Sequence, residues 1–87
     1  MKEFTYTITD PVGIHARPAG LLVKKLAGFK SAVTIERADN GASCDGKKLL
    51  ALMKLKVTQN DAIILKAEGE DEDAAIEAAR TFLSTNL

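Results

Sequence analysis

Strand-like and helix-like hydrophobic patterns follow one another in a fixed order along the 87-residue chain, and this order restricts its possible folds more than any other feature. Phe4, Tyr6 and Ile8 alternate with threonines, which is typical of a strand with one buried face. Farther along, apolar residues recur at three- and four-residue steps, which is typical of a helix. The predicted strands cover residues 2–9, 31–37, 42–44 and 62–67, and the predicted helices cover 16–27, 47–55 and a final segment that begins with the acids at 70–73.

This order, βαββαβα, predicts an α+β fold of two layers, in which helices cover one face of a mainly antiparallel four-stranded sheet. No repeat, linker or low-complexity segment interrupts it, so we expect one domain over residues 1–87. The turn signal Asp39-Asn40-Gly41 predicts a hairpin between the second and third strands. The first helix should bury one stripe and leave Leu21 exposed; the expected stripe consists of Ala19, Leu22, Val23 and Leu26.

The only histidine, His15, lies within the stretch Gly13–Gly20. Pro18 belongs in the first turn of a helix, so the helix should begin near Ala16 and place His15 at or beside its N-cap. The first backbone N–H groups of a helix lack intrahelical partners and carry partial positive charge. Arg17 adds a guanidinium whose forked donors match phosphate or carboxylate oxygens. We therefore expect an anion-binding helix start formed by Ala16 and Arg17.

This combination suits reversible phosphoryl carriage. A neutral imidazole nitrogen can accept a phosphoryl group and release it again, while the surrounding donors hold the dianion. His15 is thus the candidate acceptor and Arg17 the candidate stabilising cation. Two other interpretations fit the same residues: a surface histidine that merely caps the helix, and an anion-binding module without a covalent step.

Charge and cysteine usage exclude several classes of function. Twelve basic and twelve acidic side chains cancel, which disfavours nucleic acid as a partner. The single Cys44 cannot form an intramolecular disulfide and is expected to pack as a small core residue, and one histidine provides no zinc-ligand set. Neither a signal peptide nor an apolar run of about 20 residues is visible, so we expect a cytoplasmic protein without membrane insertion, cofactor or metal.

Gly13, His15, Arg17 and Pro18 match in place the active-site loop of the HPr family, the histidine-containing phosphocarriers of the bacterial sugar phosphotransferase system. Residues 49–57 and Gly69-Glu70-Asp71 also fall at the family's spacings, so the resemblance covers nearly the whole chain. It implies the strand order 1-4-2-3 and a largely open second sheet face.

For function, the resemblance implies that His15 accepts a phosphoryl group at Nδ1 from phosphorylated enzyme I, itself charged by phosphoenolpyruvate. His15 then donates the group to IIA domains of sugar permeases, without independent turnover. The expected state is a monomer. Leu49, Leu50 and Met53 are implied docking residues beside the exposed Leu21, although core packing is an equal alternative for the 49–53 set. A regulatory relative, whose phosphorylation state is sensed by a transcription factor or metabolic enzyme, is the competing function.

One position departs from the family pattern. In many Gram-positive members a serine opens the short second helix and is phosphorylated by a dedicated kinase, whereas alignment places Lys48 there in this chain. Ser43 lies five residues earlier, too far along the chain to substitute for that serine. We therefore expect no serine-kinase control, and a Lys48 ammonium available to acidic residues of a partner.

Overall fold

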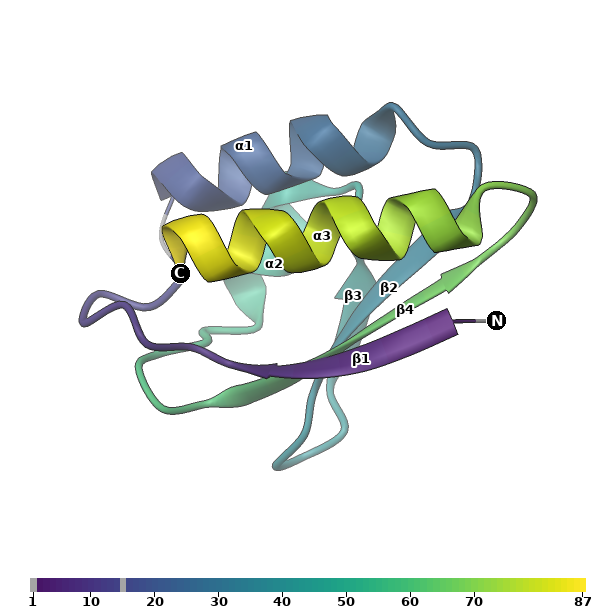
Figure 1. Cartoon of the computed structure of the whole chain (residues 1–87). Helices are drawn as coiled ribbons and strands as arrows, with labels where there is room; N and C mark the ends of the chain where they lie inside the picture. Colours follow the sequence, from purple (N-terminus) through teal and green to yellow (C-terminus); the bar gives the residue numbers. More distant parts are fainter. Residues whose placement is uncertain (1, 15) are drawn as a thin grey trace.

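A computed structural model describes residues 2–14 and 16–87 and confirms the predicted order of elements. The four strands form one antiparallel sheet in the order β1-β4-β2-β3, as the family resemblance implied (Figure 1). The strands are β1 (Lys2–Thr7), β2 (Ala32–Arg37), β3 (Ser43–Asp45) and β4 (Ala62–Glu68). The helices are α1 (Ala16–Ala27), α2 (Leu49–Lys54) and α3 (Glu72–Asn86).

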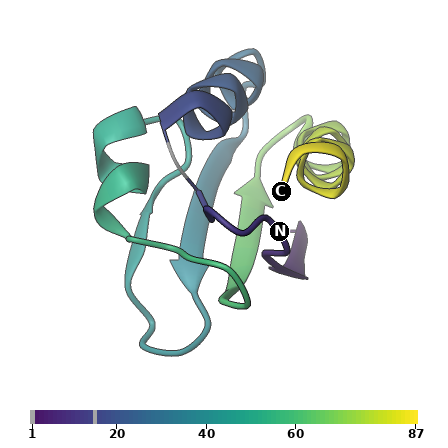
Figure 2. The ribbon, with the colours of Figure 1, turned by 90° about the vertical axis from the view of Figure 1, so that its left-hand side faces the viewer.

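Strand register decides which side chains face the helices. Phe4 pairs with Leu65, and Leu65 pairs with Ile35, so these three side chains share one face of the sheet. Leu65 and Ile35 are fully buried there. On the opposite face Lys66 and Glu36 form an ion pair of 3.5 Å between Nζ and Oε1. Figures 1 and 2 show α1 and α3 side by side over the first face, which confirms the two-layer arrangement.

The hydrophobic core lies between the helices and the sheet. Its largest fully buried side chains are Ile8, Leu22, Leu26, Ile35, Leu52, Ile63, Leu65 and Leu83. In α1 the predicted stripe is confirmed at Ala19, Leu22 and Leu26, but Val23 is only half-buried at its edge. Leu21 is 49% exposed, as predicted.

The first strand and the second helix are each at least two residues shorter than predicted, because other contacts replace their regular hydrogen bonds. The first strand ends at Thr7, since Ile8 and Thr9 donate their N–H groups to the carbonyls of Asp61 and Leu87. At the start of α2, the Lys47 N–H bonds the Asp45 carboxylate, and the helix begins at Leu49. It ends at Lys54, because Lys56 has φ +52°, outside the right-handed helical region.

The acidic run at 70–73 anchors the start of α3. Asp71 is the N-cap residue of α3, but its side chain makes no capping hydrogen bond to that helix. Its carboxylate instead accepts the Lys30 and Ser31 N–H groups at 2.8 Å and also the Ser31 hydroxyl. The hydrogen bond from that hydroxyl is the main cause that lowers the pKa of Asp71 to about 2. The start of α3 is thereby tied to the connection between α1 and β2.

Candidate functional site

The connection between β1 and α1 contains a tight turn. The Val12 N–H bonds Asp10 Oδ1 at 2.8 Å, and the Gly13 N–H bonds the Asp10 carbonyl at 2.9 Å. An aspartate whose side chain accepts a backbone N–H two residues later stabilises such a turn. The turn redirects the chain from the edge of the sheet toward the start of α1.

Residues 8–14, which we call the approach loop, are held against the segment that precedes β4. Gly13 has φ +77°, and its backbone lies directly on Val57 and Thr58. A Cβ at Gly13 would be 2.6 Å from both Thr58 Cα and the Val57 carbonyl oxygen, so only glycine fits without displacement. The Ile14 N–H donates to that same Val57 carbonyl at 3.1 Å. These contacts fix the backbone immediately before residue 15.

The last residue of the chain supports the approach loop from another side. The buried Leu87 presents its carbonyl oxygen to the N–H groups of Thr9 and Asp10 at 2.7 and 2.9 Å, and to the Thr9 hydroxyl at 2.9 Å. Figure 2 shows the end of α3 beside the approach loop. The loop is thus held by both α3 and the segment before β4.

The start of α1 is placed as the sequence predicts, with Ala16 as the first helical residue and Pro18 buried in the first turn. His15 itself lies outside the described residues. Ala16 and Arg17 are exposed, and no hydrogen bond or ion pair joins the Arg17 guanidinium to another described residue. The first N–H groups of a helix have no partner within it, so those of Ala16 and Arg17 can hold an anion together with this guanidinium. The helix start predicted from Ala16 and Arg17 therefore has the chemistry for phosphate.

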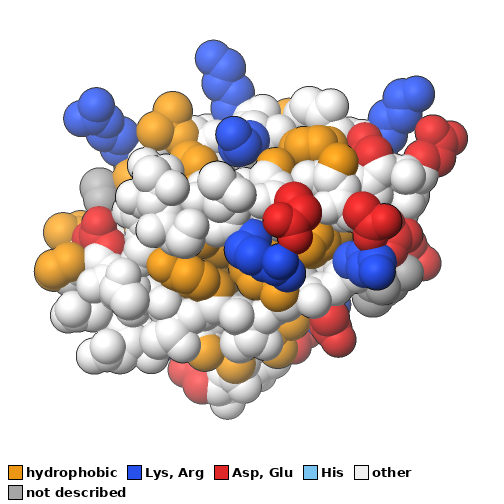
Figure 3. All heavy atoms as spheres, in the orientation of Figure 1, with side chains coloured by type: hydrophobic (Ala, Val, Ile, Leu, Met, Phe, Trp, Pro, Cys, Tyr) orange, Lys and Arg blue, Asp and Glu red, His pale blue; other side chains and the backbone are white. Residues whose placement is uncertain are grey.

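Large apolar side chains remain exposed on the approach loop, α1 and α2. The exposed fractions are 65% for Val12, 49% for Leu21, 38% for Leu49 and 76% for Leu50. Figure 2 shows that the three elements meet at one end of the molecule, and Figure 3 shows hydrophobic side chains exposed at that end. Sequence reasoning missed Val12, although a valine between Pro11 and Gly13 in a turn was a usable signal.

Two other residues predicted to contact partners lie on α2. Met53 is half-buried and packs against the core, so less of it is available to a partner than of Leu50. Lys48 is the exposed N-cap residue of α2, and its side chain makes no capping hydrogen bond. The α2 N-terminus therefore presents an ammonium group where a capping hydroxyl or carboxylate is usual.

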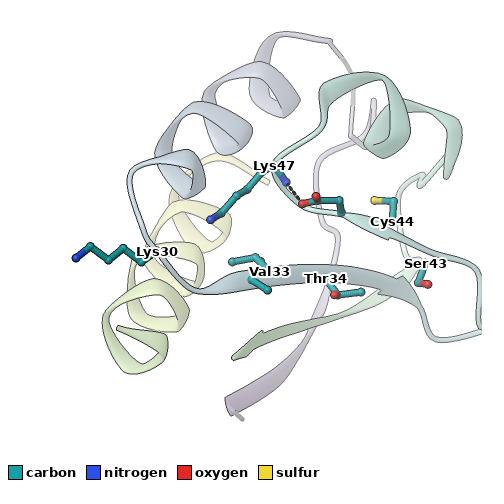
Figure 4. A pocket seen from close by; sticks show the side chains of 8 residues that line it. Lys30, Val33, Thr34, Ser43, Cys44 and Lys47 are labelled. Atoms are coloured by element: carbon teal, nitrogen blue, oxygen red, sulfur yellow. Dashed lines mark hydrogen bonds between the residues drawn. The ribbon is translucent and has the colours of Figure 1, made fainter. Parts of the chain in front are cut away.

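A hollow of ≈ 590 Å³ lies away from the start of α1, on β2, β3 and their flanking residues. Figure 4 shows that Lys30 at its rim extends away from the other labelled side chains, and the Lys47 ammonium bonds the Phe29 carbonyl at 2.7 Å. The hollow thus presents no convergent cations. Cys44 at its edge packs against the core, and burial raises the pKa of its thiol, which supports the predicted packing role.

Residues 2–14 and 16–87 contain no group of three or more His, Cys, Asp or Glu side chains placed to hold a metal ion. Over the same part of the chain, no helix is both long and apolar enough to cross a membrane.

The chain is similar to known proteins both in sequence and in fold. Residues 2–85 match the family model described as "PTS HPr component phosphorylation site". The phosphocarrier protein HPr of Mycoplasma genitalium is 42% identical over 86 residues, covering 99% of this chain and 97% of that protein. Among solved structures, an HPr from Thermoanaerobacter tengcongensis matches with a TM-score of 0.91 at 35% identity, covering 98% of this chain and 93% of that one. A structure described as an HPr dimer from the same organism matches with a TM-score of 0.76 at 35% identity, covering 98% and 95%.

Proposed function

The chain belongs to the HPr family, and on that basis we propose that it is a phosphocarrier of the phosphotransferase system with His15 as its phosphoryl acceptor. The family match carries the proposal, because it is described as a phosphorylation site and spans the chain's only histidine. The start of α1 at Ala16 supports it, since the first-turn N–H groups follow His15 directly.

In the proposed reaction, a lone pair on the His15 imidazole attacks phosphorus while the bond between phosphorus and the donor breaks. The product has an N–P bond. In the second displacement the next acceptor's nucleophile attacks phosphorus while the N–P bond breaks and its electron pair returns to the imidazole. The exposed Arg17 and the first N–H groups of α1 stabilise negative charge on the phosphoryl oxygens. The family resemblance favours Nδ1 as the phosphorylated nitrogen, and NMR of the phosphorylated protein tests this assignment.

The proposed donor is phosphorylated enzyme I, and the proposed acceptors are IIA domains of sugar permeases. Their docking surface comprises the exposed apolar residues beside the start of α1, with contributions from Met53 and Lys48. These exposed residues are Val12, Leu21, Leu49 and Leu50. Burying them against a partner would favour association and bring His15 to the partner's site. We further propose that the protein acts as a cytoplasmic monomer, and light scattering at assay concentration tests the monomer.

The deciding experiment is incubation with enzyme I and labelled phosphoenolpyruvate, followed by mass analysis of the protein. We expect one phosphoryl group that is acid-labile and base-stable, and no label in a folded His15→Ala variant. Undiminished label in that variant would refute His15 as the acceptor. Absence of label in the unaltered protein would favour an anion-binding module without a covalent step.

A further inference from the structure

One guanidinium lies at the centre of a polar cluster behind the approach loop. Arg37 is the last residue of β2, and only 13% of its side chain is exposed. It uses all five of its N–H donors. Nε and Nη2 bond the two Asp39 carboxylate oxygens at 3.0 and 2.8 Å, Nη2 also bonds Asp61 Oδ2 at 3.0 Å, and Nη1 bonds the carbonyls of Leu55 and Lys56, each at 2.9 Å.

The cluster holds residues 56–61, which we call the platform, in an unusual conformation. Lys56 and Asn60 both have positive φ, +52° and +75°, and residues other than glycine rarely adopt this backbone conformation. Such residues persist where surrounding contacts fix them. Those contacts are present: Arg37 bonds the Lys56 carbonyl, and Asp61 accepts both the N–H and the hydroxyl of Thr58, at 2.9 and 3.0 Å.

The approach loop rests on the platform, and Figure 2 shows the platform crossing below the loop that leads to α1. Three backbone hydrogen bonds join the two segments, and the Gln59 side-chain amide adds a fourth, from Nε2 to the Thr9 carbonyl at 3.2 Å. The Ile14 N–H bonds the Val57 carbonyl at 3.1 Å, the Ile8 N–H bonds the Asp61 carbonyl at 2.9 Å, and the Asn60 N–H bonds the Ile8 carbonyl at 2.8 Å. The platform therefore fixes both ends of the approach loop.

We propose that Arg37 is a positioning residue for phosphoryl transfer: together with Asp61 it holds the platform, and the platform fixes Ile14 immediately before His15. This inference rests on the proposed function for its rate prediction only. Arg37 lies 22 positions from His15 in sequence and acts through backbone contacts, so it needs no contact with the phosphoryl group. Small displacements of a reacting group can cost up to about 100-fold in rate, which makes such support consequential.

The test compares Arg37→Ala with Ser31→Ala. Ser31→Ala removes the hydroxyl bonded to Asp71, a contact of similar polar character at the other end of α1 and α3, and so controls for a general loss of stability (Figure 1). In Arg37→Ala we expect the Ile14 amide to exchange roughly tenfold faster and kcat for uptake from phosphorylated enzyme I to fall about tenfold, with KM unchanged. In Ser31→Ala both quantities should stay at the level of the unaltered protein. Equal losses in the two variants, or no change in Arg37→Ala, would overturn the proposal.

Two further variants keep the test decisive if Arg37→Ala folds poorly. Arg37→Lys retains the charge but cannot bond both carboxylates and both carbonyls at once, so we expect an intermediate loss. Adding Lys56→Gly should recover part of that loss, because glycine adopts positive φ without strain. Absence of any recovery would contradict the claim that Arg37 acts by holding Lys56. If the unaltered protein takes no label, the proposed function fails, whereas Ile14 exchange still tests the support by Arg37.

Discussion

Replacing Gly13 with alanine tests whether the close contact between the approach loop and the platform matters for folding and transfer. The added Cβ would lie 2.6 Å from Thr58 Cα and from the Val57 carbonyl oxygen, and both are backbone atoms that cannot rotate away. Gly41 is a matched control, because its φ of +74° is nearly that of Gly13 at +77°, yet a Cβ there would meet nothing within 4 Å. The pair therefore separates steric contact from backbone strain.

The magnitudes follow from three contributions. A left-handed conformation costs an alanine about 1–2 kcal/mol, while the loss of unfolded-chain freedom offsets about 0.4–1 kcal/mol. Gly41→Ala should therefore lower the free energy of unfolding by about 0–1.5 kcal/mol. At Gly13 the backbone must also move, which adds about 1–3 kcal/mol, as for an overpacked site.

The assay is urea unfolding of the three proteins, with the midpoint and slope compared. We expect Gly13→Ala to unfold at the lowest urea concentration and to accept label from phosphorylated enzyme I more slowly than Gly41→Ala. Equal free energies for the two variants would show that the approach loop moves away freely, and the reasoning from close contact would fail.

Three further outcomes are expected. Arg17→Ala should slow phosphoryl uptake about tenfold or more without unfolding the protein, and Arg17→Lys should recover only part of the rate, as quench-flow labelling can measure; equal rates would make Arg17 a solvated helix-start residue. The pKa of Asp71 is about 2 in the folded state, below its unfolded value, so its stabilising contribution is complete above about pH 4 and is lost as pH falls toward 2. Urea midpoints of Asp71→Asn and the unaltered protein should therefore converge over that interval, and a constant difference would contradict the assignment. Incubation with a serine kinase of the Gram-positive type and ATP should leave Ser43 unmodified, whereas Lys48→Ser should become a substrate; stoichiometric phosphoserine at Ser43 would refute this.

The sequence predicted those parts of the fold that depend on local patterns. The first helix was correct at both ends, because Pro18 and Gly28 act on residues next to them. The predicted end of β1 was wrong, because the alternation of apolar residues and threonines continues through Ile8. The hydrogen bond of the Ile8 N–H goes to Asp61, which is distant in sequence, so the local pattern does not reveal it. The strand order came only from the family resemblance, since periodicity carries no information on which strands pair.

The candidate site likewise has features that the sequence could predict and others that it could not. His15 and Arg17 could be proposed from residue type and spacing, and both roles remain predictions. The contacts that support the approach loop could not be predicted, because Val57 acts through its carbonyl, which every residue has. Likewise, Arg37 looks like an ordinary polar strand end until its five hydrogen bonds are seen. Asp71 was correctly placed at a helix start, but its partners, Lys30 and Ser31, lie about 40 positions away.

The carbonyl of Leu87 has a practical consequence for the transfer assays. Because it accepts three hydrogen bonds from Thr9 and Asp10, an affinity tag or fluorophore fused after Leu87 would leave the molecule beside the approach loop. Such a fusion would disturb the loop and crowd the docking surface proposed above, so slow transfer could be mistaken for a mutational effect. Lys2 lies beside the start of α3, because its ammonium pairs with Asp73 at 3.6 Å, whereas Leu87 follows the other end of that helix. A reporter attached before Lys2 would therefore lie away from the approach loop.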